Sequence, residues 1–166
     1  TDHLSRMEAF SMILQDIKFQ HLGYVLVFVS SYIDYLKLLK NYEKDICCFI
    51  SEYSTSSKIS KSKKLFNQGK KMVLVITERY YFYNRPKFKK ALYLVFYQIP
   101  LNPLFYSELI IMIQNNSEPQ KLNQPVSISL FSKFDLMRLS NVIGGQKARM
   151  VIDNKLKSKF IFRPCG

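Results

Sequence analysis

Cysteine and histidine are scarce in this 166-residue chain, which has three cysteines and two histidines. Three cysteines cannot build a disulfide framework, and no spacing of cysteine and histidine suits zinc, so we expect no metal and no other cofactor. Cys47 and Cys48 are neighbours in an apolar run. We expect them to be buried free thiols of a protein from a reducing compartment.

Long apolar runs are also missing. No stretch reaches the roughly 18 apolar residues of a membrane-spanning helix, and no signal-peptide pattern opens the chain, so we expect no membrane partner and no secretion. The chain begins with Thr1, directly in a helical pattern. We therefore expect a fragment of a longer protein, in which residues 1–166 form one domain.

The sequence motifs of several enzyme classes are absent. The phosphate-loop pattern GxxxxGK[ST] does not occur, so this chain cannot supply the main ATP cradle. Neither GxSxG nor HExxH occurs. The carboxylates of Glu52, Glu78 and Glu108 are isolated in the sequence and do not support an acid–base assignment.

Acidic residues are few, and the basic excess is unevenly placed. The chain has 25 lysines and arginines against 12 acidic residues, a net charge of +13. Residues 58–90 alone hold 11 basic residues and one acidic residue, a net charge of +10. A concentrated positive field attracts polyanions, although an ordinary solvated surface is the alternative. The candidate RNA-binding residues are Lys58, Lys61, Lys63, Lys64, Lys70, Lys71, Arg79, Arg85, Lys87, Lys89 and Lys90.

Strand and helix patterns alternate along the whole chain. Strands are predicted at residues 24–30, 46–50, 72–76, 92–97, 126–131 and 160–162, and the first two are expected to be buried. Helices are predicted at residues 5–20, 31–42, 103–114, 132–141 and 146–154, with a basic amphipathic helix around residues 60–66 that Gly69 closes. This alternation indicates an α/β fold with three layers, in which a mostly parallel sheet of about six strands has helices on both faces.

Polar and aromatic residues follow the third predicted strand. Thr77, Glu78 and Arg79 come directly after it, at the carboxyl edge where such sheets place their sites. They could hold a phosphate or a domain partner, or Thr77 or Glu78 could simply cap a short helix. Residues 80–83 are four aromatics flanked by Arg79 and Arg85. They could stack on bases, but we expect at least two to be core residues.

Several motifs, in matching order, resemble the C-terminal RecA-like domain of the digestive-organ-expansion-factor family. Residues 77–83 are similar to the family's TERFHFF-type run, residues 93–100 to its NLIFYELP-type strand, and residues 103–108 to its PxFYSE signature. The resemblance extends from Met7 to Phe162, with departures at Asn84, Pro86 and Lys90.

The resemblance implies a function. Members of this family are DEAD-box-like pseudohelicases of the nucleolar small-subunit processome. Active DEAD-box enzymes carry an aspartate and an Arg-Gly pair after the third strand, and an HRxGRxxR run in a later helix. In this chain Glu78 stands in place of the aspartate, and residues 106–110 lack those arginines. Arginines near a γ-phosphate are worth orders of magnitude in rate, so their replacement argues against hydrolysis.

The expected function is therefore a non-catalytic scaffold in the nucleolus, acting in small-subunit pre-rRNA processing. Its expected partners are pre-rRNA or a small nucleolar ribonucleoprotein, other processome proteins and its own N-terminal RecA-like domain. Thr77, Glu78 and Arg79 would be a degenerate helicase motif. Two alternatives remain: the second half of an active ATP-dependent RNA helicase, and a pure protein–protein adaptor.

Overall fold

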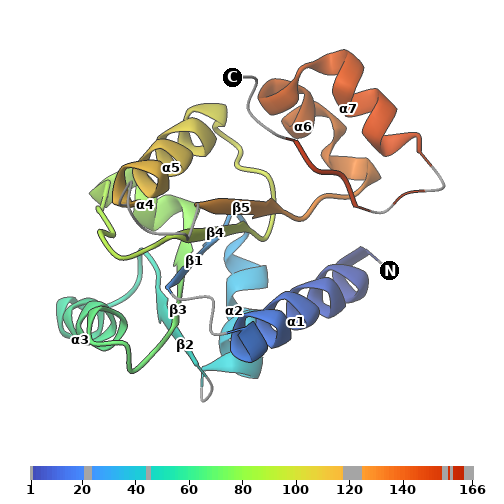
Figure 1. Cartoon of the computed structure of the whole chain (residues 1–166). Coiled ribbons are helices and arrows are strands. Elements are labelled where there is room, and N and C mark those ends of the chain that lie inside the picture. Colours follow the sequence, from blue (N-terminus) through green and yellow to red (C-terminus); the bar gives the residue numbers. More distant parts are fainter. Residues whose placement is uncertain are drawn as a thin grey trace.

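A five-stranded parallel sheet forms the centre of the computed structural model, which describes residues 2–20, 24–43, 46–117, 125–154, 157 and 159–162 (Figure 1). The strand order is β2-β3-β1-β4-β5, and every neighbouring pair is parallel. The strands are β1 (Val25–Val29), β2 (Cys47–Ile50), β3 (Val73–Thr77), β4 (Tyr93–Phe96) and β5 (Val126–Ser129). The α/β fold with a parallel sheet is thus as predicted.

Helices cover both faces of the sheet. One face carries α1 (Asp2–Gln20) and α2 (Tyr32–Tyr42), and the other carries α3 (Ser56–Asn67), α4 (Glu78–Asn84) and α5 (Pro103–Asn116) (Figure 1). Side chains alternate along β1, so Val25, Val27 and Val29 pack with α1 and α2. Leu26 and Phe28 pack toward α3, α4 and α5. Two separate cores therefore sandwich the sheet, which explains why β1, β2 and β4 are apolar and β3 is apolar up to Thr77, whereas the exposed edge strand β5 alternates apolar residues with serine.

The C-terminal part forms a third, smaller cluster. After the short 3-10 helix η1 (Lys133–Asp135), the helices α6 (Leu136–Ile143) and α7 (Gly145–Ile152) pack together to one side of the sheet (Figure 1). Their core consists of Leu139, Ala148 and Val151 around Ile99, which follows β4. This pair of helices is anchored to the main body through the segment that also leads into α5.

Local capping interactions explain where most helices begin. Ser31, Thr55 and Asn102 are the N-caps of α2, α3 and α5, and each accepts a backbone hydrogen bond with its side-chain oxygen. Pro103 occupies the first turn of α5, as predicted. Gly69 follows α3 with a φ of 73°, which a glycine adopts without strain.

Several predicted boundaries were wrong. The first helix begins at Asp2 rather than at Ser5, so Ser5 lies within it. Helix α3 begins at Ser56, before the basic helix predicted around residues 60–66, because Thr55 supplies the cap. The sixth strand expected at residues 160–162 is not formed, and these residues have no regular secondary structure. Helix α5 continues to Asn116, two residues past the predicted end at residue 114.

Cys47 and Cys48 are buried free thiols in β2, as predicted. Burial raises the pKa of the Cys48 thiol to about 12. The third cysteine, Cys165, lies outside the described residues.

Candidate nucleic-acid interface

The carboxyl edge of β3 is built from three consecutive polar residues. Thr77 caps α4, because its Oγ1 accepts a hydrogen bond from the Tyr80 backbone N–H at 3.2 Å. The same hydroxyl donates to Glu52 Oε2 at 2.6 Å. Thr77 is therefore a helix cap that also joins β3 to the segment after β2, and the capping alternative considered above is confirmed.

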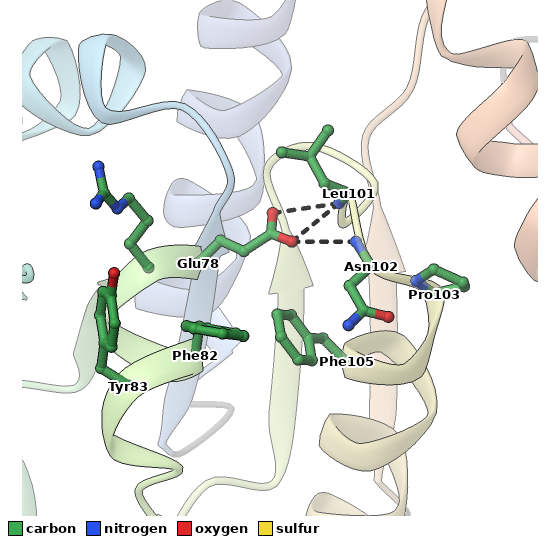
Figure 2. Close-up of a pocket in the computed structure, with 8 residues that line it drawn as sticks. Glu78, Phe82, Tyr83, Leu101, Asn102, Pro103 and Phe105 are labelled. Carbon is green, nitrogen blue, oxygen red and sulfur yellow. Dashed lines mark hydrogen bonds between the residues drawn. The ribbon is translucent and has the colours of Figure 1, made fainter.

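Glu78 is buried, and its carboxylate is occupied by the chain itself. It accepts hydrogen bonds from the Leu101 backbone N–H at 3.1 and 3.2 Å and from the Asn102 backbone N–H at 3.2 Å (Figure 2). Charge-assisted hydrogen bonds of this kind are the strong ones in proteins. Glu78 therefore fixes the loop that precedes α5 against the start of α4.

Arg79 is the exposed member of the three. Its side chain is 63% exposed, and its Nε lies 3.9 Å from Glu52 Oε1, which is a loose ion pair. A hydrogen bond with the Tyr83 hydroxyl raises the pKa of the Arg79 guanidinium above its ordinary value. The guanidinium thus stays charged and faces solvent at the carboxyl edge of the sheet.

A groove lies between α4 and the start of α5. It encloses about 580 Å³ and is lined by Glu78, Arg79, Phe82, Tyr83, Leu101, Asn102, Pro103 and Phe105 (Figure 2). The rings of Phe82 and Phe105 lie beside each other, with centroids 6.3 Å apart. Phe82 is 54% exposed, Tyr83 63% and Leu101 61%, so the groove presents an apolar surface to solvent.

The four aromatic residues of α4 divide into two pairs. Tyr80 and Tyr81 are buried, whereas Phe82 and Tyr83 are exposed, as we predicted in expecting at least two core residues. The Tyr81 hydroxyl donates to Glu108 Oε2 at 3.0 Å. Burial raises the pKa of Tyr81 to about 12, and this hydrogen bond acts in the same direction. Only Phe82 and Tyr83 are available to a ligand.

Arg85 connects α4 to α5. It ends α4 in the left-handed conformation, with φ 40° and ψ 50°. Its guanidinium pairs with the Glu108 carboxylate and lies 4.5 Å from the Phe105 ring centroid. Arg85 was a candidate RNA contact, but its charge is already matched by a carboxylate of the same chain.

The candidate lysines lie on α3 and at its C-terminal end. Lys61 and Lys64 are exposed on α3, and Lys58 and Lys63 are half-buried there. Because α3 connects two parallel strands, it runs from the carboxyl edge of the sheet back to the amino edge. The lysines along α3 are therefore progressively farther from Arg79.

Further lysines gather near the amino edge of the sheet. Lys70 follows α3 and is exposed, as are Lys87 and Lys89 in the loop before β4. In that loop, Lys90 Nζ contacts the Asn67 carbonyl oxygen at the end of α3 and lies 5.2 Å from the Tyr24 ring centroid. The loop before β4 and the end of α3 are thus neighbours. Lys71 Nζ donates to the Glu43 carbonyl oxygen at 3.4 Å.

The basic stretch is therefore divided. One part is the lysine surface, which we define as Lys58, Lys61, Lys63, Lys64, Lys70, Lys87, Lys89 and Lys90. The other is Arg79, next to the groove at the carboxyl edge, from which α3 leads the lysine surface toward the amino edge. The direction of α3 could have been foreseen, since a crossover helix between parallel strands must run antiparallel to them.

Two buried polar contacts were not foreseen. Gln98 Nε2 donates to Asp34 Oδ2 at 2.5 Å, and Gln98 Oε1 accepts from the Ser31 backbone N–H at 3.0 Å. The second contact joins Arg6 to Asp135, with Nη2 and Oδ2 3.0 Å apart. For the contact between Gln98 and Asp34, the only signal in the sequence was that Asp34 is an acidic residue in the first turn of a helix that follows a buried strand.

The described residues contain neither a metal-binding cluster nor a membrane-spanning helix. Among them, no group of three or more His, Cys, Asp or Glu side chains could hold a metal ion. In the same part of the chain, no helix combines the length and apolarity needed to cross a bilayer.

Comparison with protein families decides the family membership. The model of the family described as Utp25, C-terminal domain, matches residues 1–162. The chain belongs to this family. It is 32% identical over 154 residues to the U3 small nucleolar RNA-associated protein 25 homolog of Xenopus tropicalis, covering 91% of this chain and 20% of that protein.

Other relatives agree. The U3 small nucleolar RNA-associated protein 25 of Candida albicans is 34% identical over 145 residues, covering 84% of this chain and 20% of that protein. Protein NUCLEOLAR FACTOR 1 of Arabidopsis thaliana is 30% identical over 161 residues, covering 95% of this chain and 21% of that protein. The chain spans about a fifth of the length of these curated relatives.

Solved structures with the same fold include RecA-like domains of DEAD-box proteins. The Escherichia coli DEAD-box protein SrmB, in a complex with regulator of ribonuclease activity A, superposes with a TM-score of 0.64 at 16% identity, covering 80% of this chain and 75% of that one. Domain 2 of the DEAD-box helicase Mss116p, bound to an RNA duplex, gives a TM-score of 0.58 at 18% identity, covering 93% of this chain and 59% of that one. At these identities the likeness shows the fold alone.

Proposed function

We propose that this chain is a non-catalytic scaffold domain of a nucleolar ribosome-biogenesis factor, acting in small-subunit pre-rRNA processing. Its RNA partner is pre-rRNA or the U3 small nucleolar ribonucleoprotein, and its protein partners are other processome proteins and its own N-terminal RecA-like domain. The names of the relatives, which contain the words U3 small nucleolar RNA-associated and nucleolar, support this proposal. We also infer that the digestive-organ-expansion-factor family and the Utp25 family are one family under two names.

The observation that carries the proposal is the use of Glu78. In the position of a helicase aspartate, its carboxylate is buried and accepts hydrogen bonds from the backbone of the loop before α5. The nearby Arg85 pairs with Glu108 on α5. At the edge where a motor domain would direct such groups to a nucleotide, this chain uses them to hold its own helices together. That arrangement supports a structural role, and a pseudohelicase, over ATP hydrolysis.

The lysine surface supports contact with RNA. It presents several ammonium groups along one side of α3 and around its end, without a competing carboxylate among residues 58–77. Such a surface grips phosphates without reading the sequence. Each phosphate neutralised on a single strand contributes about 0.7 to the slope of log K against log salt.

A filter-binding series with the 166-residue chain tests this role. Binding of single-stranded and structured RNA is measured at several salt concentrations for the original chain and for a Lys58→Ala, Lys61→Ala, Lys64→Ala variant. If all three contact phosphates of a single strand, we expect the slope to become shallower by about 2. The matched control replaces Lys133, Lys147 and Lys157, which are exposed outside the lysine surface. The absence of salt-sensitive binding would leave the pure adaptor as the better function.

ATP turnover by the full-length protein tests the enzyme alternative. We expect RNA-stimulated hydrolysis to be at background and unchanged by Arg79→Ala. Turnover that Arg79→Ala abolished would instead make this chain the second half of an active RNA helicase.

A further inference from the structure

The groove at the carboxyl edge of the sheet has a chemistry that the lysine surface does not share. Its walls are mostly apolar, formed by Phe82, Leu101, Pro103 and Phe105. Just beyond them Leu104 is 65% exposed. A contiguous patch of exposed apolar side chains often marks an interaction site, whereas single exposed apolar residues do not.

The polar side chains of the groove offer hydrogen-bond donors. The Glu78 carboxylate is occupied by backbone N–H groups (Figure 2), so it does not act as an acceptor for a ligand. Asn102 uses its side-chain oxygen to cap α5 at 3.0 Å, which leaves its amide N–H groups as donors. The guanidinium of Arg79 and the hydroxyl of Tyr83 complete the rim. A ligand that matches this rim brings acceptors, and preferably a negative charge.

Only one cation lies among the residues that line the groove. It is Arg79, whereas the lysine surface extends along α3 toward the opposite edge of the sheet. RNA needs several cations along its backbone, and protein–nucleic acid interfaces are more polar and far more positive than this groove. An apolar floor with a single arginine at its rim is instead the chemistry of a protein interface anchor.

We propose that this groove docks a short segment of a partner protein in which an aliphatic or aromatic side chain lies next to an acidic residue. The apolar side chain packs on the exposed face formed by Phe82, Leu101 and Pro103. The acidic residue pairs with Arg79 and accepts a hydrogen bond from Tyr83. The site is preorganised, because Thr77 caps α4 and Glu78 fixes the loop before α5. This inference rests on the scaffold function proposed above and names the chemistry of one protein partner.

Selection from a phage-displayed library of 12-residue peptides, with the 166-residue chain as target, tests the proposal. We expect the enriched peptides to place an acidic residue within a few positions of an aromatic or aliphatic one. Synthetic, fluorescein-labelled copies are then titrated by fluorescence anisotropy. Enrichment of basic peptides, or of none, would overturn the proposal.

Charge reversal provides the specific readout. Arg79→Glu should weaken binding of a selected peptide at least tenfold, and a copy with lysine in place of its acidic residue should bind this variant better than it binds the original chain. Phe82→Ser should weaken binding to a similar extent. The matched control, Arg149→Glu, reverses an exposed arginine on α7 outside the groove and should leave the affinity unchanged. If Arg79→Glu and Arg149→Glu weakened peptide binding equally, the loss of affinity would come from the change in net charge alone, and the proposal would be overturned.

Two other occupants would give distinct results. Displacement of the peptide by single-stranded RNA, with Phe82→Ser weakening RNA binding equally, would make the groove an RNA site. Self-association of the chain that Phe82→Ser abolished, measured by sedimentation, would assign the groove to a second copy. Either result overturns the inference. Failure of peptide binding with salt-sensitive RNA binding intact refutes this inference alone, whereas loss of RNA binding refutes the RNA role and leaves the groove's test unaffected.

Discussion

Breaking the ion pair between Arg6 and Asp135 should destabilise this domain more than any single change on its surface. Arg6 lies in α1 and Asp135 in η1, 129 positions apart, and their side chains are only 8% and 9% exposed. Asp135 Oδ2 also accepts hydrogen bonds from the Ser132 backbone N–H at 2.9 Å and from Ser132 Oγ at 3.2 Å. The perturbation is Arg6→Met, which removes the charged guanidinium and keeps an unbranched, shorter, apolar side chain.

The expected loss follows from the burial of the pair. Removing one partner of a buried pair costs about 3–5 kcal/mol, because the other charge is left uncompensated. Asp135 keeps its two bonds from Ser132, so we expect the lower end, about 3 kcal/mol. For a domain of this size each 1 kcal/mol lowers Tm by roughly 2–4 °C, so Tm should fall by about 6–12 °C.

Urea unfolding followed by far-UV circular dichroism measures the change. The control is Arg149→Met, an exposed arginine on α7, which should change stability by less than about 0.5 kcal/mol. A double-mutant cycle with Asp135→Asn should give a coupling energy well above the roughly 0.5 kcal/mol of independent sites. The reasoning is refuted if Arg6→Met lowers the free energy of unfolding no more than Arg149→Met does. It is also refuted if the effects of Arg6→Met and Asp135→Asn are additive.

Three further changes test other parts of the structure. Glu78→Gln leaves backbone N–H groups of the loop before α5 without a charged acceptor, so the free energy of unfolding from urea titration should fall by about 2 kcal/mol. Amide hydrogen exchange in that loop should accelerate. Unchanged exchange would contradict the role of Glu78 in fixing this loop. Gly69→Ala should lower the free energy of unfolding by about 1 kcal/mol or more, because φ is 73° and the new Cβ would lie 3.1 Å from the Tyr24 hydroxyl oxygen. An unchanged or raised free energy of unfolding would show that the backbone at this turn adjusts without strain. Burial raises the pKa of Tyr35 and of Tyr81 to about 12 from an ordinary 10.0, so unfolded chains ionise first and stability should be full below pH 10 and fall as the pH rises toward 12. Urea midpoints at pH 9 and pH 11 check this, and Tyr81→Phe should reduce the difference between them.

The sheet and its layers were predictable because the strands carry a strong local signal. Each is a short, Val- or Ile-rich run bounded by polar residues, and the intervals between them are too long for hairpins. The expected strand at residues 160–162 failed since three apolar residues carry no periodicity that could distinguish a strand from an extended tail. Helix α4 was only one of two alternatives, because four consecutive aromatics do not follow the spacing of a helix.

The candidate site was predictable in position but not in detail. The topology of a parallel sheet places Thr77, Glu78 and Arg79 at its carboxyl edge from sequence alone. The use of Glu78 depends on backbone N–H groups 23 and 24 positions away, which no local pattern reveals. The same holds for Arg85, whose partner Glu108 lies 23 positions along the chain. Charge density in the sequence therefore overstated how many cations are available to a ligand.

The course of α3 has a consequence for how two partners can share this domain. Lys58 and Lys64 are six positions apart, so the helical part of the lysine surface is about 9 Å long, enough for only a couple of phosphates. To reach Lys90, a bound RNA strand would continue past Asn67 at the end of α3, whose carbonyl oxygen Lys90 contacts, and α3 leads away from Arg79 and the groove. If both proposals hold, the domain can hold the two ligands at once and is a bridge between an RNA and a protein.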